Sequence, residues 1–196
     1  MEPFLVKKGI PYFKMTDGTI YSSPLPQFNK IGGQDEIRRN KDHNPERMIR
    51  IISFFNFQKK NYKVADYGAG NGLFVNFLLE KGIDAVGYDK YNPCMNQPLL
   101  KENFDVVTAI EVLEHTSEPY SEVDEIFDCL KPGGILMVEM SFIDWMDEND
   151  PYIDPDLGHS TIFSHKGLDL LMLIKGFQVY TPINRNVRIF KKPIQK

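Results

Sequence analysis

A glycine-rich turn headed by an acidic residue is the part of the sequence best suited to hold a ligand. Residues 64–72 read VADYGAGNG, and Asp66 ends a short apolar run. Glycines let the backbone turn sharply and approach a ligand closely. The N-terminus of a following helix offers free N–H groups to a carboxylate or phosphate. The turn therefore predicts a binding site, and the residues expected to contribute to it are Asp66, Tyr67, Gly68, Ala69 and Gly70.

A second carboxylate, Asp89, ends the next apolar run and indicates a nucleoside ligand. The carboxyl ends of neighbouring parallel strands meet at one crevice, where ligands of open α/β sheets bind. Asp89 can accept charge-assisted hydrogen bonds there from both ribose hydroxyls; the alternative is a residue that only shapes the turn. Lys90, Ile110 and Glu111 are expected at the same crevice as cofactor contacts. The alternative for Glu111 is a solvated or helix-capping carboxylate.

The glycine spacing distinguishes two cofactors. A dinucleotide fingerprint reads G-x-G-x-x-G; Gly68 and Gly70 fit its first two positions, but Leu73 stands at the third. A carboxylate at Asp66 would repel a pyrophosphate and attract a sulfonium ligand that carries an ammonium group. The pattern thus favours S-adenosylmethionine. An NAD-dependent oxidoreductase and a noncatalytic S-adenosylmethionine-binding regulatory or scaffold module remain the alternatives.

Two histidines follow the expected crevice in the sequence. His159 belongs to a long segment, residues 141–163, which we expect to close over the acceptor of a transferred group. A hydroxyl acceptor requires a base, and His159 is the first candidate. His115 lies just past an expected strand end, where packing and backbone hydrogen bonds are the commoner role. Tyr152 lines an acceptor pocket or anchors the segment; the sequence leaves both open.

Alternating strands and helices must position these residues. Alternation of this kind predicts an α/β fold with a mostly parallel sheet covered on both faces. The link between the last two strands is too short for a parallel crossover, so they should be antiparallel. The expected strands cover residues 62–67, 83–88, 104–110, 135–140, 177–181 and 187–191, and the expected helices cover residues 71–81, 118–130 and 164–174, after a first helix that starts at Asn44.

Several of these motifs together resemble class I S-adenosylmethionine-dependent methyltransferases. Residues 66–72 look like their motif I, and Asp89 matches their ribose-binding acid. Residues 104–115 (FDVVTAIEVLEH) and 130–136 (LKPGGIL) are similar to runs of the subgroup that includes quinone-biosynthesis and sugar methyltransferases. The resemblance covers roughly residues 44–191. It implies methyl transfer and a Rossmann-like, doubly wound, seven-stranded sheet whose last strand is antiparallel.

Two features depart from the pattern of that family. Residues 90–103 leave little room for the usual third strand and helix, so that strand is expected to be vestigial. Residues 1–43 form an N-terminal arm or cap with two short β pieces, at 10–14 and 19–22, while residues 44–196 form the cofactor-binding domain. The arm is similar to a stretch that carries a Cys-x-x-Cys zinc ribbon in some relatives, but its cysteines are missing here.

Bulk properties limit the partners. The 196 residues carry a formal net charge of −4, which disfavours nucleic acid because its phosphates attract basic surfaces. Cys94 and Cys129 form no Cys-x-x-Cys pair, and the acidic segment 141–163 lacks a calcium-loop pattern, so no metal is expected. No secretory leader or membrane span stands out. The sequence predicts a cytoplasmic enzyme with a small-molecule acceptor, such as a sugar or other metabolite, and leaves its oligomeric state open.

Overall fold

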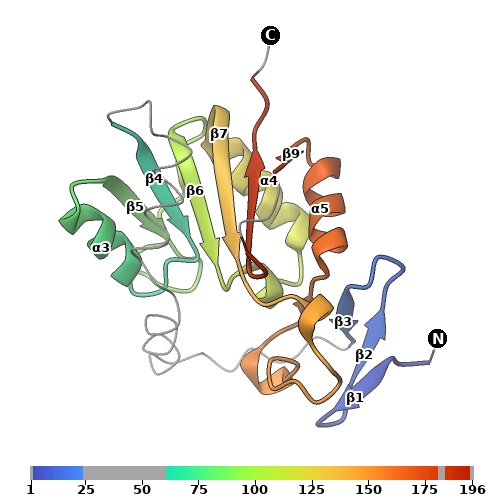
Figure 1. Cartoon of the computed structure of the whole chain (residues 1–196). Coiled ribbons are helices and arrows are strands. Elements are labelled where there is room, and N and C mark those ends of the chain that lie inside the picture. Colours follow the sequence, from blue (N-terminus) through green and yellow to red (C-terminus); the bar gives the residue numbers. More distant parts are fainter. Residues whose placement is uncertain (1, 24–60, 181–183, 195–196) are drawn as a thin grey trace.

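A six-stranded sheet forms the centre of the molecule (Figure 1). The computed structural model describes residues 2–23, 61–180 and 184–194. The strand order is β5-β4-β6-β7-β10-β9; the first four strands are parallel, and β10 runs antiparallel to both β7 and β9. The strands are β4 (Lys63–Tyr67), β5 (Asp84–Tyr88), β6 (Phe104–Ile110), β7 (Leu130–Glu139), β9 (Gln178–Val179) and β10 (Val187–Lys191).

Helices cover both faces of this sheet. Alternate residues of each strand point to opposite faces of the sheet, so each face presents apolar side chains to a helix. Val75 and Leu78 pack on one face, whereas Ile126 and Leu171 pack on the other. Burial of such side chains contributes roughly 1.5–3 kcal/mol each. The doubly wound α/β fold predicted from the sequence is therefore confirmed. The helices are α3 (Leu73–Glu80) on the first face, and α4 (Pro119–Cys129) and α5 (His165–Ile174) on the second.

The short connection after β5 explains why the sheet has six strands instead of seven. Residues 89–103 form only turns and irregular backbone, so the third strand of the expected sheet is missing from this described segment. The antiparallel pairing of the last two strands is confirmed. The helix expected to start at Asn44 lies outside the described residues.

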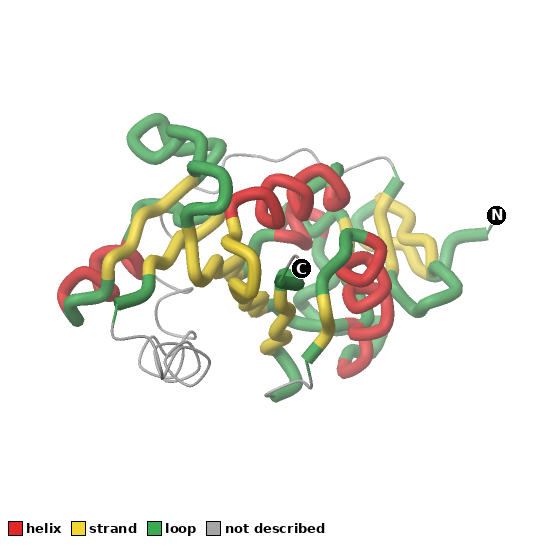
Figure 2. The backbone as a smooth tube through the Cα atoms, turned by 90° about the horizontal axis from the view of Figure 1, so that it is seen from above, coloured by secondary structure: helices red, strands yellow, loops and turns green. Residues whose placement is uncertain are grey.

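A second, smaller sheet joins the N-terminal arm to the segment after β7. Its order is β1-β2-β3-β8, and all its pairs are antiparallel. The β pieces expected in the arm are confirmed. The arm lies at the opposite end of the molecule from α3 (Figure 2). The strands of this sheet are β1 (Leu5–Lys7), β2 (Ile10–Lys14), β3 (Ile20–Ser22) and β8 (Thr161–Ile162).

The segment between β7 and α5, residues 141–163, is built into the fold. It contains the 3-10 turns η2 (Ile143–Trp145) and η3 (Pro155–Leu157) as well as β8. A small apolar cluster of Tyr12, Ile20, Ile153 and Ile162 joins it to the arm. In Figure 1 the segment and the arm lie at the end of the sheet to which the parallel strands point. Among the described helices, none combines the length and apolar character that crossing a membrane requires.

Candidate functional site

The glycine-rich turn follows β4 directly, as the sequence predicted. Gly68, Gly70 and Gly72 have φ angles of 77°, 58° and 78°, a region that side chains disfavour. A Cβ atom on Gly68 would also lie only 2.4 Å from a methyl of Val112. The N–H groups of Gly68 and Ala69 donate to the carbonyl of Tyr88 at the end of β5. These contacts join the turn to the neighbouring strand end.

Asp89 lies against this turn. Its Oδ2 accepts from the N–H of Gly70 at 2.8 Å, and its Oδ1 accepts from the N–H groups of Tyr91 and Asn92 at 2.8 and 3.1 Å. The side chain of Asn92 donates back to the carbonyl of Gly70 at 2.7 Å. Asp89 is thus brought to the turn as expected, and it also shapes the backbone there, which was the alternative considered for it.

Asp66 is a buried carboxylic acid at the end of β4. It is 4% exposed, and the hydroxyl of Thr108 on β6 donates to its Oδ1 at 2.6 Å. Burial raises the pKa of Asp66 to about 7; the bond from Thr108 opposes the rise, and the charge of Asp89 adds to it. A cationic group at this place would favour the ionised form.

The other predicted cofactor contacts lie in different surroundings. The hydroxyl of Tyr67 donates to Glu122 and, at 2.7 Å, to Glu125, so this side chain points to α4. Lys90 is 62% exposed and lies 3.6 Å from Glu122. Ile110 is half-buried and packs with the core beneath α3. Because the side chain of Tyr67 points to α4, Tyr67 can contribute to the turn only through its backbone.

Glu111 marks the end of β6 with an unusual backbone. Its φ of 52° is rare for a residue with a side chain, and its N–H donates to the carbonyl of Glu139 at 2.8 Å. Such strain occurs mostly where the surrounding structure fixes it, often at ligand sites. An oxygen of its carboxylate lies 3.2 Å from the hydroxyl of Tyr152. Glu111 therefore faces the segment after β7.

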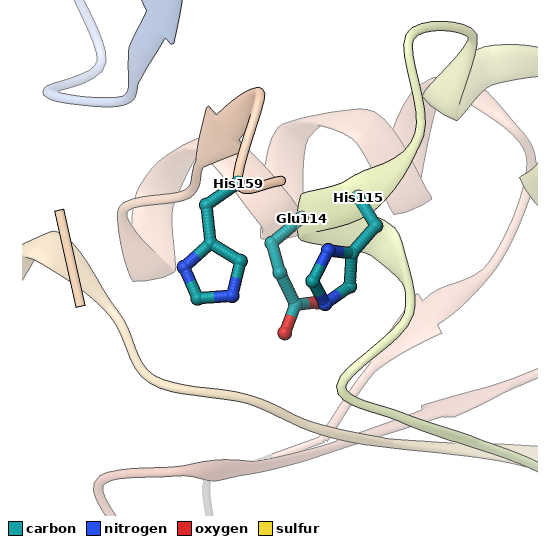
Figure 3. Close-up of side chains that lie close together, drawn as sticks. All are labelled: Glu114, His115 and His159. Carbon is teal, nitrogen blue, oxygen red and sulfur yellow. The ribbon is translucent and has the colours of Figure 1, made fainter. Parts of the chain in front are cut away.

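Next to Glu111, three potential ligand side chains meet (Figure 3). Glu114 is completely buried, and the rings of His115 and His159 lie 4.7 Å apart. One donor atom from each of the three lies within 4.8 Å of the others. The ring of Tyr152 stacks on His159 at 4.1 Å, and its hydroxyl donates to Glu114 at 2.7 Å. We call Glu114, His115 and His159 the Glu-His-His cluster.

Electrostatics favour a charged Glu114 within this cluster. Burial alone would raise the pKa of its carboxyl, but the two neighbouring imidazoles and the bond from Tyr152 outweigh it and lower the pKa. His159 is 4% exposed, and its Nδ1 lies 2.7 Å from the carbonyl of Tyr152. Because a carbonyl oxygen only accepts, Nδ1 is the donor in that bond, and Nε2 is the other ring nitrogen.

Backbone docking brings the two segments of the cluster together. The N–H of Ser160 donates to the carbonyl of Glu114 at 2.8 Å, and its hydroxyl donates to the carbonyl of Thr116 at 2.9 Å. From the arm, the hydroxyl of Tyr12 donates to the carbonyl of His159 at 3.1 Å. Sequence reasoning missed Glu114 and Tyr12. The spacing of Glu111, Glu114 and His115 along one short turn was the available indication for Glu114.

The sequence of this chain is similar to a known protein family and to several curated proteins. The family model of a methyltransferase domain matches residues 40–181. The chain is 29% identical over 124 residues to a ubiquinone biosynthesis O-methyltransferase of Pseudomonas fluorescens, covering 52% of this chain and 53% of the relative. A protein of the same name from Aliivibrio fischeri is 29% identical over 116 residues, covering 46% and 48%. The chain spans about half the length of the curated relatives it matches.

Solved structures share the fold at low sequence identity. A SAM-dependent methyltransferase from Archaeoglobus fulgidus aligns with a TM-score of 0.60 at 18% identity, covering 79% of this chain and 94% of that one. The 1,6-didemethyltoxoflavin-N1-methyltransferase of Burkholderia thailandensis aligns with a TM-score of 0.61 at 16% identity, covering 98% and 100%. With the family model spanning most of the chain, this protein belongs to the methyltransferase domain family.

Proposed function

We propose that this protein transfers a methyl group from S-adenosylmethionine to a small-molecule acceptor. The observation that carries the proposal is the bond between Gly70 and Asp89, because it joins a glycine turn and a carboxylate at the adjacent ends of two parallel strands. Membership of the methyltransferase family and the names of the curated relatives support the same activity.

The residues at the turn fit this cofactor. Asp89 is proposed to accept from the ribose hydroxyls, and the buried carboxyl of Asp66 is proposed to face the cationic part of the ligand, directly or through water. The bond from Gly70 to Asp89 and the burial of Asp66 support these roles. Gly68, Ala69 and Gly70 supply a backbone without bulky side chains. S-adenosylmethionine supplies an activated methyl group on a sulfonium when it is bound. Much of the remaining catalysis can come from holding the two reactants in line.

The acceptor is proposed to lie between the turn and the segment 141–163. The Glu-His-His cluster and Glu111 are the polar groups that this part of the molecule offers to it. With a hydroxyl acceptor, the oxygen bonds to the methyl carbon while the carbon–sulfur bond breaks and its electron pair stays on sulfur. The hydroxyl proton needs a base, and Nε2 of His159 is the candidate. An amine or activated carbon acceptor would need positioning alone.

Formation of S-adenosylhomocysteine with a panel of hydroxylated, amine and carbon acceptors tests the proposal. We expect turnover with at least one small molecule, and we expect Asp89→Ala to weaken cofactor affinity about 10- to 100-fold. Because Asp89 also holds three backbone N–H groups, this variant should melt at a lower temperature as well.

Glu118→Ala is a control on an exposed residue and should leave both quantities unchanged. Cofactor binding without turnover of any acceptor would favour the noncatalytic binding module instead. Binding of NAD in place of either methionine nucleoside would refute the proposed cofactor.

A further inference from the structure

The Glu-His-His cluster has the composition of a metal centre. We infer that Glu114, His115 and His159 bind one divalent transition-metal cation at the acceptor side of the crevice. Two imidazoles and one carboxylate are the ligand set of many catalytic zinc sites, in which a fourth position stays open. The three donor atoms lie within 4.8 Å of one another. Donor atoms around one tetrahedral zinc ion lie about 3.4 Å apart, so the separations between these donor atoms must shrink by up to about 1.4 Å, which side-chain rotations can supply.

The hydrogen bonds of Glu114 leave one of its oxygens available to a cation. The Oε1 atom accepts from Tyr152, but Oε2 is buried without a hydrogen-bond partner among the described residues. A buried carboxylate oxygen without a partner destabilises a fold unless a cation or donor compensates it. Figure 3 shows this carboxylate lying between the two imidazole rings, where a shared cation would supply that partner.

The groups around the cluster hydrogen-bond to its members and fix their orientation, as the neighbours of metal ligands usually do. A ligating histidine usually donates its other ring N–H to a carbonyl or carboxylate. His159 has this arrangement, because its Nδ1 lies 2.7 Å from the carbonyl of Tyr152, which leaves Nε2 for the ion. The hydroxyl of Tyr152 meanwhile orients Glu114 and lies 3.2 Å from Glu111. One tyrosine thus positions two of the three ligands.

The ligand types select the class of cation. Mg²⁺ and Ca²⁺ prefer oxygen donors, whereas imidazoles suit Zn²⁺, Co²⁺ and their neighbours. This inference departs from the sequence-based expectation of no metal. That expectation rested on missing cysteine pairs and calcium loops, but here the ligands come from two segments more than forty residues apart. The docking of residue 160 on residues 114 and 116 brings them together in the fold.

A role for the cation rests on the proposed methyl transfer. Its open position would take the oxygen of a hydroxyl acceptor, and coordination lowers the pKa of such an oxygen. The hydroxyl proton then leaves to water, and the oxygen electron pair forms the bond to the methyl carbon as the carbon–sulfur bond breaks. In that state Nε2 of His159 is a ligand and no longer the base.

Titration calorimetry on chelator-treated protein tests the site without any turnover. We expect one Zn²⁺ or Co²⁺ per chain and no comparable binding of Mg²⁺. Glu114→Gln and His159→Gln should weaken binding at least about 100-fold, and Tyr152→Phe about 10-fold. The matched control is His165→Gln, since this histidine contacts Asp144 and the carbonyl of Arg185 and lies outside the cluster. Bound Co²⁺ should also give visible absorption bands that the two ligand variants lose.

Two results would overturn the inference. One is the absence of stoichiometric Zn²⁺ or Co²⁺ binding in folded wild-type protein. The other is equal binding by wild type and by ligand variants whose circular dichroism is unchanged. The proposed function is judged separately, by S-adenosylhomocysteine formation. Turnover of a hydroxyl acceptor that persists undiminished after metal removal would contradict the catalytic role and leave His159 as the base.

Discussion

At the scale of single residues, the raised pKa of Asp66 predicts that cofactor affinity depends on pH. Its pKa of about 7 in the folded protein means that a cationic ligand must displace a proton below neutral pH. Affinity for S-adenosylhomocysteine should therefore rise about tenfold from pH 6 to pH 8 and level off above. Calorimetry in buffers of different ionisation enthalpy should show about half a proton released per ligand near pH 7.

The matched variant is Asp66→Asn, which keeps the shape but cannot ionise. Its affinity should be lower at pH 8 and vary less with pH than that of the wild type. An acid whose folded pKa is raised stabilises the fold below its unfolded value and loses that contribution as pH rises. The unliganded wild type should therefore lose stability relative to Asp66→Asn between about pH 4 and pH 7. Identical pH profiles for the two proteins would show that Asp66 does not titrate.

The site could be predicted from the sequence where its residues are neighbours along the chain or end adjacent strands. Asp66, the glycine turn and Asp89 meet this condition, and they come together as expected. His115 and His159 were considered only one at a time, because 43 positions separate them and no local pattern fixes a contact across the loop. Sequence spacing also gives no account of side-chain direction, which is why Tyr67 was expected at the turn although its ring points to α4.

At the scale of elements, the small sheet of arm and loop holds His159 in place. The hydroxyl of Tyr12 donates to the carbonyl of His159, and β3 pairs with β8 directly after it. Tyr12→Phe leaves that carbonyl without its partner, so we expect a loss of about 1 kcal/mol in the free energy of unfolding. Turnover should fall, since His159 moves, whereas cofactor affinity should stay within about twofold, because Asp89 lies elsewhere. Denaturant titration and steady-state kinetics measure both.

Tyr21→Phe is the control for this variant, because Tyr21 lies on the neighbouring strand and packs on Phe13 at 5.7 Å. It should leave turnover unchanged. Equal losses of turnover in both variants would show that the arm contributes only general stability and does not position His159.

Elements with strong periodicity were predictable, and those defined by tertiary contacts were not. β6 and β10 have the bounds expected from their apolar runs, and Ser164 caps α5 with a bond from the N–H of Gly167. The two-residue strand β8 carries no pattern of its own and exists only because β3 lies beside it. The missing third strand was indicated by the short chain between β5 and β6, since a strand and a crossover helix need more residues.

At the scale of the whole molecule, cofactor binding should stabilise the entire domain. The turn and Asp89 connect β4 to β5, and Asp66 connects to β6 through Thr108, so the proposed cofactor contacts reach three strands of one cooperative sheet. A ligand that binds only the folded state adds about 2.7 kcal/mol at a free concentration 100 times its Kd. For a chain of this size that corresponds to a rise in Tm of about 5–10 °C.

We therefore expect S-adenosylhomocysteine to raise the Tm by this amount and NAD at equal concentration to leave it unchanged, as measured by differential scanning fluorimetry. Asp89→Ala should lose about half of the rise or more, because its weaker affinity needs about 10- to 100-fold more ligand for the same effect. The control Glu118→Ala should keep it. A rise with NAD alone would assign the turn to a dinucleotide despite Leu73 at its third glycine position. A rise that survives intact in Asp89→Ala would place the nucleoside away from the ends of β4 and β5.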